Sequence, residues 1–143
     1  MVLATALAAT GATYVVSPDG TGDFATIQDA INAAADRDVV ELTAGVFSGP
    51  GNRDIDFLGK ALTVRSRDGD PGACAIDCSG SDADPHRGFV FQSGEGPESV
   101  LAGVTVTGGW VDTRGGGILC EDLASPTITN CVLLENVAGT GGG

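Results

Sequence analysis

The sequence contains few basic residues. Seven Lys and Arg stand against nineteen Asp and Glu, which gives a formal net charge of −12 at neutral pH. A surface of this charge repels phosphate groups, so nucleic acid and anionic membranes are poor partners. No apolar run is long enough to cross a bilayer, and we expect no membrane span. The acidic side chains are expected to keep an exposed, strand-rich protein soluble.

Histidine and cysteine are also scarce, which limits metal chemistry. His86 is the single histidine, and the cysteines are Cys74, Cys78, Cys120 and Cys131. The spacing of Cys74 and Cys78 is not that of a zinc knuckle, which argues against a cysteine–histidine metal site. Cys120 and Cys131 align with apolar positions in the repeat described below. We therefore expect buried thiols, with a disulfide as the alternative.

The N-terminal segment 1–12 is apolar and built from small residues. It resembles the apolar region and cleavage site of a secretory signal, although no basic residue precedes it. We interpret it as the remnant of a signal, with an ordinary tail as the alternative. The protein is accordingly expected to be secreted or at the cell surface.

Aromatic residues make up only 5% of the chain, whereas glycine is abundant at 23 residues. This composition favours thin coils with sharp corners over a thick globular core. The length of 143 residues suits one domain.

A near-repeat in the last third of the chain indicates the fold. Residues 88–91 and 100–106 align with residues 117–120 and 127–133, at offsets of 29 and 27 residues. Repeats of this length built from short strands predict a solenoid, in which each turn buries its apolar side on a neighbour. The alignment places Phe91 on Cys120.

The corners and the inward positions of the two repeats also match. Gly103 aligns with Asn130, and both residue types tolerate the left-handed backbone that a sharp corner needs. The inward-facing residues are expected to stack in rows: Leu101, Val104 and Val106 of one coil on Ile128, Cys131 and Leu133 of the next.

The N-terminal third predicts one strand followed by one helix. A strand is expected at 13–16, and Thr26 with Asp29 has the spacing of a helix capping box. An apolar stripe at helical spacing follows, formed by Ile27, Ala30, Ile31 and Ala34. Further strands are expected at 39–42, 46–47, 61–66 and 75–78.

These elements predict one domain over residues 13–143. Its N-terminal cap covers residues 13–36, and three to four coils fill residues 37–143, with no C-terminal cap visible. An uncapped solenoid exposes strand edges and its apolar row. We therefore expect either the N-terminal part of a longer solenoid or a unit that assembles through its C-terminal end.

Two stretches carry a resemblance to a known family. Residues 19–34, which run Asp-Gly-Thr-Gly-Asp-Phe-Ala-Thr-Ile-Gln-Asp-Ala-Ile-Asn-Ala-Ala, are similar to the N-terminal cap of right-handed parallel β-helix proteins of the pectin-lyase-like fold. Residues 115–131 are similar to the coil repeat of secreted bacterial β-helix proteins and of polymorphic outer-membrane-type proteins. The resemblance implies an all-β, right-handed parallel β-helix with a short capping helix.

The resemblance implies less about activity, because the family contains lyases, hydrolases, esterases and adhesins. Its enzymes carry outward polar side chains that converge from adjacent coils. The outward positions here, Val90 and Leu119 on the first strand of each coil, are apolar. None of the family's catalytic motifs matches, so no catalytic residue is assigned.

We therefore expect a secreted, non-catalytic scaffold, surface or carbohydrate-contacting module that associates with itself end to end. The first alternative is the N-terminal fragment of a pectate lyase, pectin methylesterase or polygalacturonase-like enzyme whose catalytic coils are missing. The second is a segment of an adhesin or autotransporter passenger.

Three groups of residues are candidates for binding. Four aspartates in two loops, Asp68, Asp70, Asp82 and Asp84, offer oxygens of the kind that hold calcium, with solvated turns as the alternative. No other cofactor is expected.

Arg65 and Arg67 alternate on a strand, and Trp110 follows a glycine corner. These three residues are the candidates for contact with a polysaccharide. The alternatives are a solvated strand face for the arginines and cover for a coil edge for Trp110. The adjacent pair His86 and Arg87 is expected to be an exposed loop end.

Overall fold

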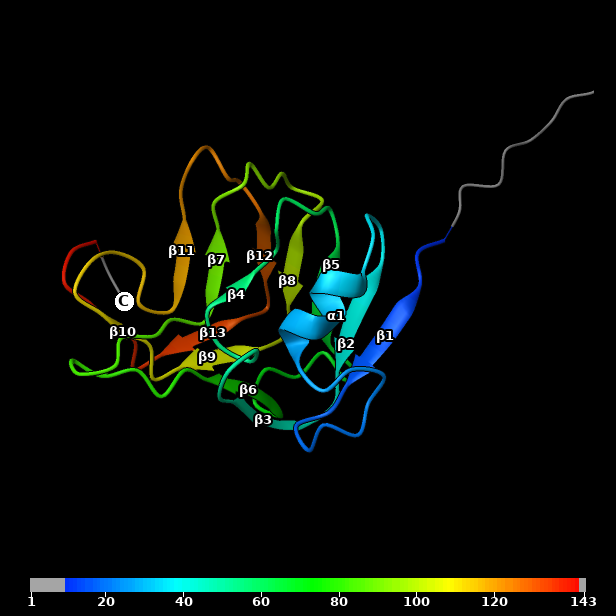
Figure 1. The fold of residues 1–143 in the computed structure, drawn as a ribbon, viewed down its shortest axis with the longest axis horizontal. Coiled ribbons are helices and arrows are strands. Elements are labelled where there is room, and N and C mark those ends of the chain that lie inside the picture. The colour runs from blue at the N-terminus through cyan, green and yellow to red at the C-terminus, as the bar shows by residue number, and fades with distance from the viewer. Residues whose placement is uncertain (1–9, 142–143) are drawn as a thin grey trace, which may run out of the picture.

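A computed structural model describes residues 10–141, and the chain winds into a parallel β-solenoid of about five turns (Figure 1). Residues 1–9 of the predicted signal remnant lie outside the described residues. Each turn contributes one strand to sheet A, in the order β1 (Thr13–Val16), β2 (Val39–Leu42), β5 (Thr63–Ser66), β8 (Val100–Ala102) and β12 (Thr127–Thr129).

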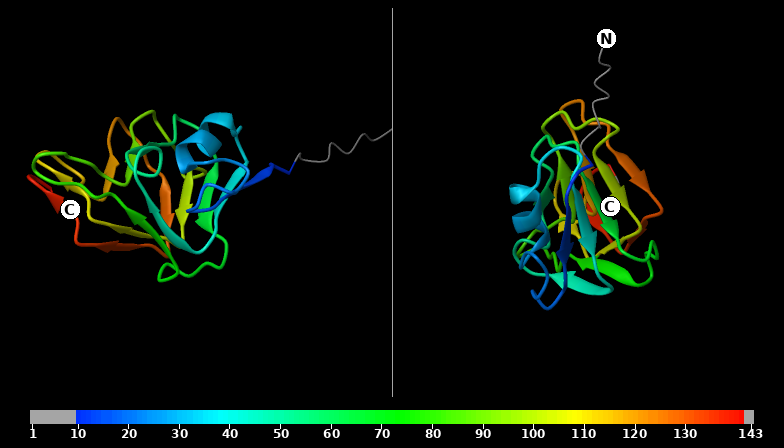
Figure 2. Two further views of the ribbon diagram at one scale, coloured as in Figure 1. Left: turned by 60° about the horizontal axis from the view of Figure 1, so that its bottom comes forward. Right: turned by 90° about the vertical axis from the view of Figure 1, so that its right-hand side faces the viewer.

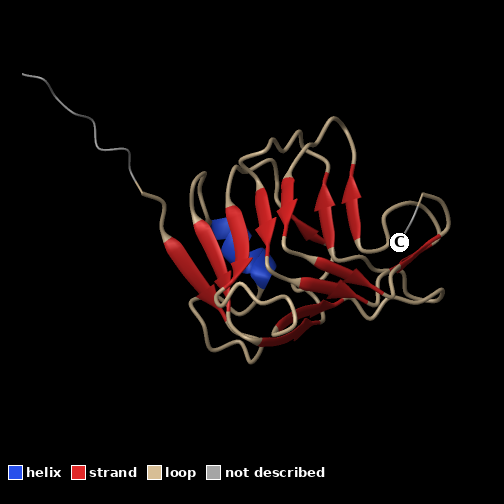
Figure 3. Ribbon diagram, turned by 180° about the vertical axis from the view of Figure 1, so that it is seen from behind, coloured by secondary structure: helices blue, strands red, loops and turns tan. Residues whose placement is uncertain are grey.

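The other faces of the solenoid are formed by three smaller sheets (Figure 3). Sheet B contains β3 (Gly45–Ser48), β6 (Cys74–Asp77), β9 (Thr105–Thr107) and β13 (Val132–Leu134). Sheet C contains β4 (Ile55–Asp56), β7 (Phe89–Phe91) and β11 (Ile118–Cys120). Sheet D contains β10 (Trp110–Val111) and β14 (Val137–Ala138). All of these strand pairs are parallel, as a solenoid requires.

The predicted register is confirmed. Cys120 pairs with Phe91, and Thr129 pairs with Ala102, so that the corner residues Gly103 and Asn130 follow equivalent positions. Both corner residues have positive φ, 70° for Gly103 and 49° for Asn130. At Gly103 a side chain would also clash, because an added Cβ would lie 2.5 Å from the Ser66 Oγ.

The core is a set of rows that run along the solenoid axis. Leu101 and Val106 are fully buried, as predicted. Under sheet C the row is aromatic: Phe57 packs against Phe91 with their ring centroids 4.6 Å apart, and Phe89 lies beside them. Phenylalanine supplies the largest buried side chains of this protein. A few aromatic residues therefore fill much of the core.

The predicted helix is confirmed as α1 (Ile27–Ala33), which packs on the first turns (Figure 2). Thr26 is its N-cap, and the Thr26 Oγ1 accepts a hydrogen bond from the Asp29 N–H at 3.1 Å. The apolar stripe is buried against the core. At the C-terminal end the Lys60 Nζ donates to three backbone carbonyls, those of Ile31, Asn32 and Ala34. Helix α1 therefore covers the core at the N-terminal end.

The solenoid has about five turns when β1 of the N-terminal cap is counted, and four strands of sheet A, β2, β5, β8 and β12, lie within residues 37–143. No repeat is recognisable in the sequence of the earlier turns because their corners differ in length. Between sheets A and B the corner is 43–44 in one turn and 67–73 in the next. The two-residue strands β4, β10 and β14 are also too short to give an alternating pattern.

The last turn is uncovered. Leu101 and Val106 are 0% exposed, whereas their register partners Ile128 and Leu133 are 40% and 49% exposed. The expectation of a buried thiol is wrong for Cys120, which is exposed although its partner Phe91 is buried. Within residues 10–141 no further coil lies over these side chains.

Candidate functional site

A groove of about 440 Å³ lies on the outer face of sheet C, and we call it the sheet C groove. Val90 of β7 and Leu119 of β11 pair side by side and line it with apolar atoms. The polar residues that line the same groove are Arg87, Gln92, Thr113, Arg114 and Glu121. Its volume falls in the range of small-ligand sites.

The sheet C groove carries more positive than negative charge. The Arg114 Nη2 lies 3.6 Å from the Glu121 Oε2, a loose pair at the protein surface. The Arg87 Nη2 lies 3.5 Å from the Thr113 Oγ1, and among the ion pairs of residues 10–141 none includes Arg87. Two guanidinium groups against one carboxylate make a local positive site on an otherwise acidic chain.

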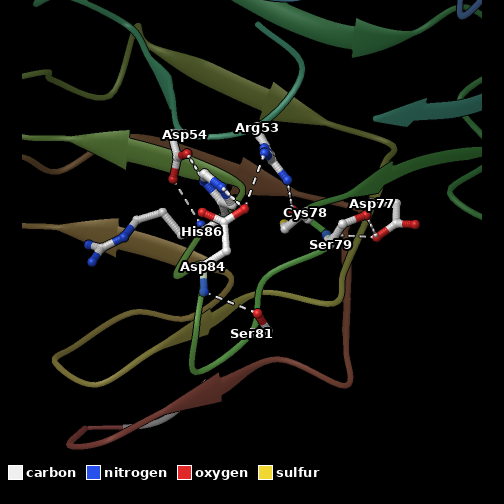
Figure 4. Close-up of polar contacts among 9 residues, drawn as sticks. Arg53, Asp54, Asp77, Cys78, Ser79, Ser81, Asp84 and His86 are labelled. Atoms are coloured by element: carbon white, nitrogen blue, oxygen red, sulfur yellow. Dashed lines mark hydrogen bonds and ion pairs between the residues drawn. The ribbon is translucent and has the colours of Figure 1, made fainter. Parts of the chain in front are cut away.

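Arg87 is held in place through its backbone. Its N–H donates to the Asp54 Oδ1 at 2.9 Å, and its carbonyl accepts from the Asp54 N–H at 2.7 Å. The other carboxylate oxygen of Asp54 bonds the Nδ1 of His86 at 2.5 Å (Figure 4). The backbone at Arg87 is therefore fastened to the preceding turn, while its guanidinium reaches the groove.

His86 lies between two carboxylates (Figure 4). Its Nε2 is 3.2 Å from the Asp84 Oδ2, a distance that suits an ion pair, but the direction is not that of a hydrogen bond. Arg53 donates to the Cys78 carbonyl at 3.1 Å and approaches Asp84 at 3.8 Å. These contacts fix the conformation of the corner formed by residues 78–88. Within this corner, Arg87 lines the sheet C groove.

Arg65 and Arg67 are brought together at the outer face of sheet A, where both pair with one carboxylate. Glu41 accepts from Arg67 at 2.8 Å and from Arg65 at 3.2 Å. The hydrogen bond from Arg67, followed by the contact with Arg65, holds the pKa of the Glu41 carboxyl below its usual value although partial burial opposes it. The two arginines line a second, smaller groove of about 340 Å³ beside Asn130.

The four candidate calcium ligands do not form one cluster. Asp68 and Asp70 lie at the corner between sheets A and B, and Asp82 and Asp84 lie at the corner between sheets B and C. All four are exposed, and Asp70 caps its own turn by accepting from the Gly72 N–H. In the described part of the chain no group of three or more acidic, histidine or cysteine side chains is placed to hold a metal ion.

Trp110 is half-buried on β10, and its backbone bonds reciprocally to His86. The Trp110 N–H donates to the His86 carbonyl at 2.8 Å, and the His86 N–H donates to the Trp110 carbonyl at 3.0 Å. Trp110 lines neither of the two grooves described above. Its role as a sugar contact stays a prediction.

The four cysteines differ in burial. Cys74 and Cys78 are buried, and burial raises the pKa of each to about 12. Cys131, which was expected to be buried, is only partly buried. Cys120 is exposed at the last turn, although partial burial of its sulfur and the nearby Glu95 carboxylate raise its pKa. All four thiols are free, with no disulfide among them.

We expect a thiol reagent at pH 8 to label Cys120 in the folded protein and to leave Cys74 and Cys78 unlabelled until the protein unfolds. The thiolate is the reactive form, and burial suppresses both its population and its access. Peptide mapping by mass spectrometry after timed labelling checks this. Equal labelling of Cys74 and Cys120 in the folded state would contradict the burial of Cys74 in the core.

The sheet C groove was not predicted from the sequence. Val90 and Leu119 were expected to face outward, and their apolar character argued against a catalytic site. The missed residues Arg114, Gln92 and Glu121 lie in or beside loops. One signal was present: Arg87 and Arg114 are 27 positions apart, which is the offset of the repeat.

The fold and the grooves define a class, a parallel β-solenoid closed by a helix at its N-terminal end. No protein family, curated protein or solved structure matches the chain. In the part of the chain that the structure describes, no helix has the length and the apolar character needed to cross a membrane.

Proposed function

We propose that this chain is a non-catalytic solenoid that contacts carbohydrate through the sheet C groove, as part of a secreted or surface scaffold. One observation carries the proposal: Arg87 and Arg114 line a groove whose apolar part is Val90 and Leu119. A sugar ring offers C–H groups to such an apolar surface and hydroxyls to Gln92 and Thr113. Because guanidinium binds carboxylate in a two-pronged geometry, a sugar with a carboxylate fits best.

The lining of the groove supports binding rather than hydrolysis. Glycosidases use two carboxyl groups on either side of the scissile bond. Glu121 is the single carboxylate among the residues that line the sheet C groove, and Arg114 faces it. The enzyme-fragment and adhesin alternatives stay predictions that no observation on the described residues tests.

The rest of the surface opposes a long acidic polymer. The net charge of −12 repels a polyanion at a distance, so the attraction must come from contacts within the groove. A short oligomer with few carboxylates therefore fits better than an extended acidic chain. This points to short uronic-acid oligosaccharides as the probe.

We expect Arg87→Gln to weaken binding of a short oligogalacturonate by about tenfold or more, because a charge-assisted hydrogen bond contributes about 1.5–3 kcal/mol. Isothermal titration calorimetry measures the affinity. Arg37→Gln is the matched control, because Arg37 is exposed and lies outside both grooves. This substitution removes the same charge as Arg87→Gln. The control variant is expected to bind as the unmodified chain does.

Two results would overturn the assignment to the sheet C groove, and a third would reject carbohydrate binding altogether. One is an equal loss of affinity in Arg37→Gln, which would mean that total charge, not the groove, governs binding. The other is a loss confined to Arg67→Gln, which would place the contact in the groove on sheet A instead. Absence of binding by the unmodified chain would reject carbohydrate contact of this class.

A further inference from the structure

The two ends of the solenoid differ in their free strand edges. At the N-terminal end the outer edge of β1 is occupied by Asp23, whose N–H donates to the Val15 carbonyl and whose carboxylate accepts from the Val15 N–H, both at 2.7 Å. The outer edge of β4 is occupied by the side-chain amide of Gln28, which bonds both the N–H and the carbonyl of Asp56.

The start of the remaining strand at that end, β3, is also obstructed. Pro18 lies so close to Gly45 that an added Cβ there would come within 2.7 Å of the Pro18 Cγ. Proline has no N–H to offer a new strand. Together with α1 over the core, these contacts leave the N-terminal end poorly suited to pairing with another strand.

The C-terminal end carries none of these protections in the residues described. The strands β11, β12 and β13 are the last members of sheets C, A and B, and each leaves one edge without a partner. Between them lie the half-exposed side chains of Ile128 and Leu133 and the exposed Cys120. We call this surface the C-terminal face.

The strands at the C-terminal face carry no charge that would repel a like surface. Natural edge strands are commonly protected by charged side chains. The strands β11, β12, β13 and β14 carry no charged residue, although the chain as a whole has a net charge of −12. Two such faces can approach without like charges meeting on the strands.

We propose that a second copy of this chain covers the C-terminal face, face to face, and forms a closed dimer. The copy offers what the face lacks, namely free strand edges around an apolar centre. Because its N-terminal end is obstructed, the copy can offer them only through its own C-terminal face. The contact is therefore isologous and ends at two chains, whereas head-to-tail stacking would give filaments.

This arrangement reverses the direction of the strands across the contact. A two-fold axis perpendicular to the solenoid turns each strand around, so the pairs between the two copies are antiparallel. Antiparallel edges pair at least as well as parallel ones. Ile128 and Leu133 of each copy are then buried against the apolar centre of the other.

Sedimentation velocity of the full chain over a range of concentrations tests the proposal. We expect a reversible monomer–dimer equilibrium with no larger species. Leu133→Asp should raise the dimer dissociation constant by about tenfold or more, because it places an unpaired carboxylate at the contact. Circular dichroism confirms that the variant is folded, which is expected since Leu133 is half-exposed in a single chain.

Val46→Asp is the matched control. Val46 is exposed on β3, in the same sheet as Leu133 but at the opposite end of the solenoid. Its substitution should leave the dimer unchanged. A monomer at every concentration would overturn the proposal and leave the face to a different partner. A mass that grows without limit, or an equal effect of Val46→Asp, would replace it with head-to-tail stacking.

Discussion

Replacing Phe91 with alanine is expected to lower the free energy of unfolding by about 3–5 kcal/mol. Phe91 is fully buried, and its ring packs on Phe57 with the centroids 4.6 Å apart. The substitution removes that contact and leaves a cavity between successive turns, which rigid strands on both sides keep from collapsing. Urea denaturation followed by circular dichroism gives the value.

The matched control is the next residue in the same row. Cys120 is the register partner of Phe91 on the following turn, but it is exposed. Cys120→Ala should therefore change the free energy of unfolding by less than about 1 kcal/mol. Similar losses in the two variants would mean that the last turn is covered in the folded chain, contrary to its exposure here.

Glu95→Ala is expected to destabilise the fold by about 2–3 kcal/mol, because it removes a buried carboxylate that accepts two charge-assisted hydrogen bonds. The Glu95 side chain is only 1% exposed. Its two carboxylate oxygens accept from the N–H groups of Gly59 and Ser93, both at 2.9 Å. Its backbone carbonyl accepts from the Ser125 N–H at 2.7 Å, so Glu95 links the same corner in three successive turns.

Two further variants separate the carboxylate from general effects. Glu95→Gln keeps the shape but turns an amide N–H₂ toward one of the two donors, so an intermediate loss is expected. Glu98→Ala removes the same charge from an exposed position in the same loop and should be nearly neutral. If Glu98→Ala and Glu95→Ala destabilise equally, loss of charge rather than loss of the buried bonds governs this corner.

The parts of the fold that the sequence predicted are those in which successive turns resemble each other. Gly103 and Asn130 identified the corner because only a few residue types adopt positive φ readily. Leu101 and Val106 identified the inward row because strands alternate with a period of two. The capping spacing of Thr26 and Asp29 identified the start of the helix.

The sequence did not predict features that depend on neighbours far apart in the chain. The strands of the earlier turns were predicted, but no repeat was recognised among them because their corners vary in length, which removes the fixed period. Cys120 was expected to be buried because its aligned residue is buried, yet burial at a given row requires a further turn on top. Gln28 protects the edge of β4 by bonding the backbone of Asp56, which is 28 positions away in the sequence. No local sequence pattern indicates such a contact.

The candidate site was predicted least well for a related reason. Arg65 lies on β5 and Arg67 directly follows its end, a proximity that the sequence displays. The carboxylate that pairs with them, Glu41, belongs to the preceding turn. Arg87 and Arg114 come from corner loops on consecutive turns, and only the stacking of those turns places them in one groove. Groove residues on a solenoid become visible once the register is known.

Amide hydrogen exchange measured at low and high protein concentration tests the central claim most directly, namely that the solenoid is closed at its N-terminal end and pairs through its C-terminal face. We predict that the outward-facing backbone amides of β12 and β13, which do not bond β8 and β9, exchange quickly in dilute protein and become protected as the concentration rises. The Val15 amide of β1, which donates to Asp23, should exchange slowly at both concentrations. Protection of β12 and β13 that does not change with concentration, or that changes equally in β1, would contradict the account.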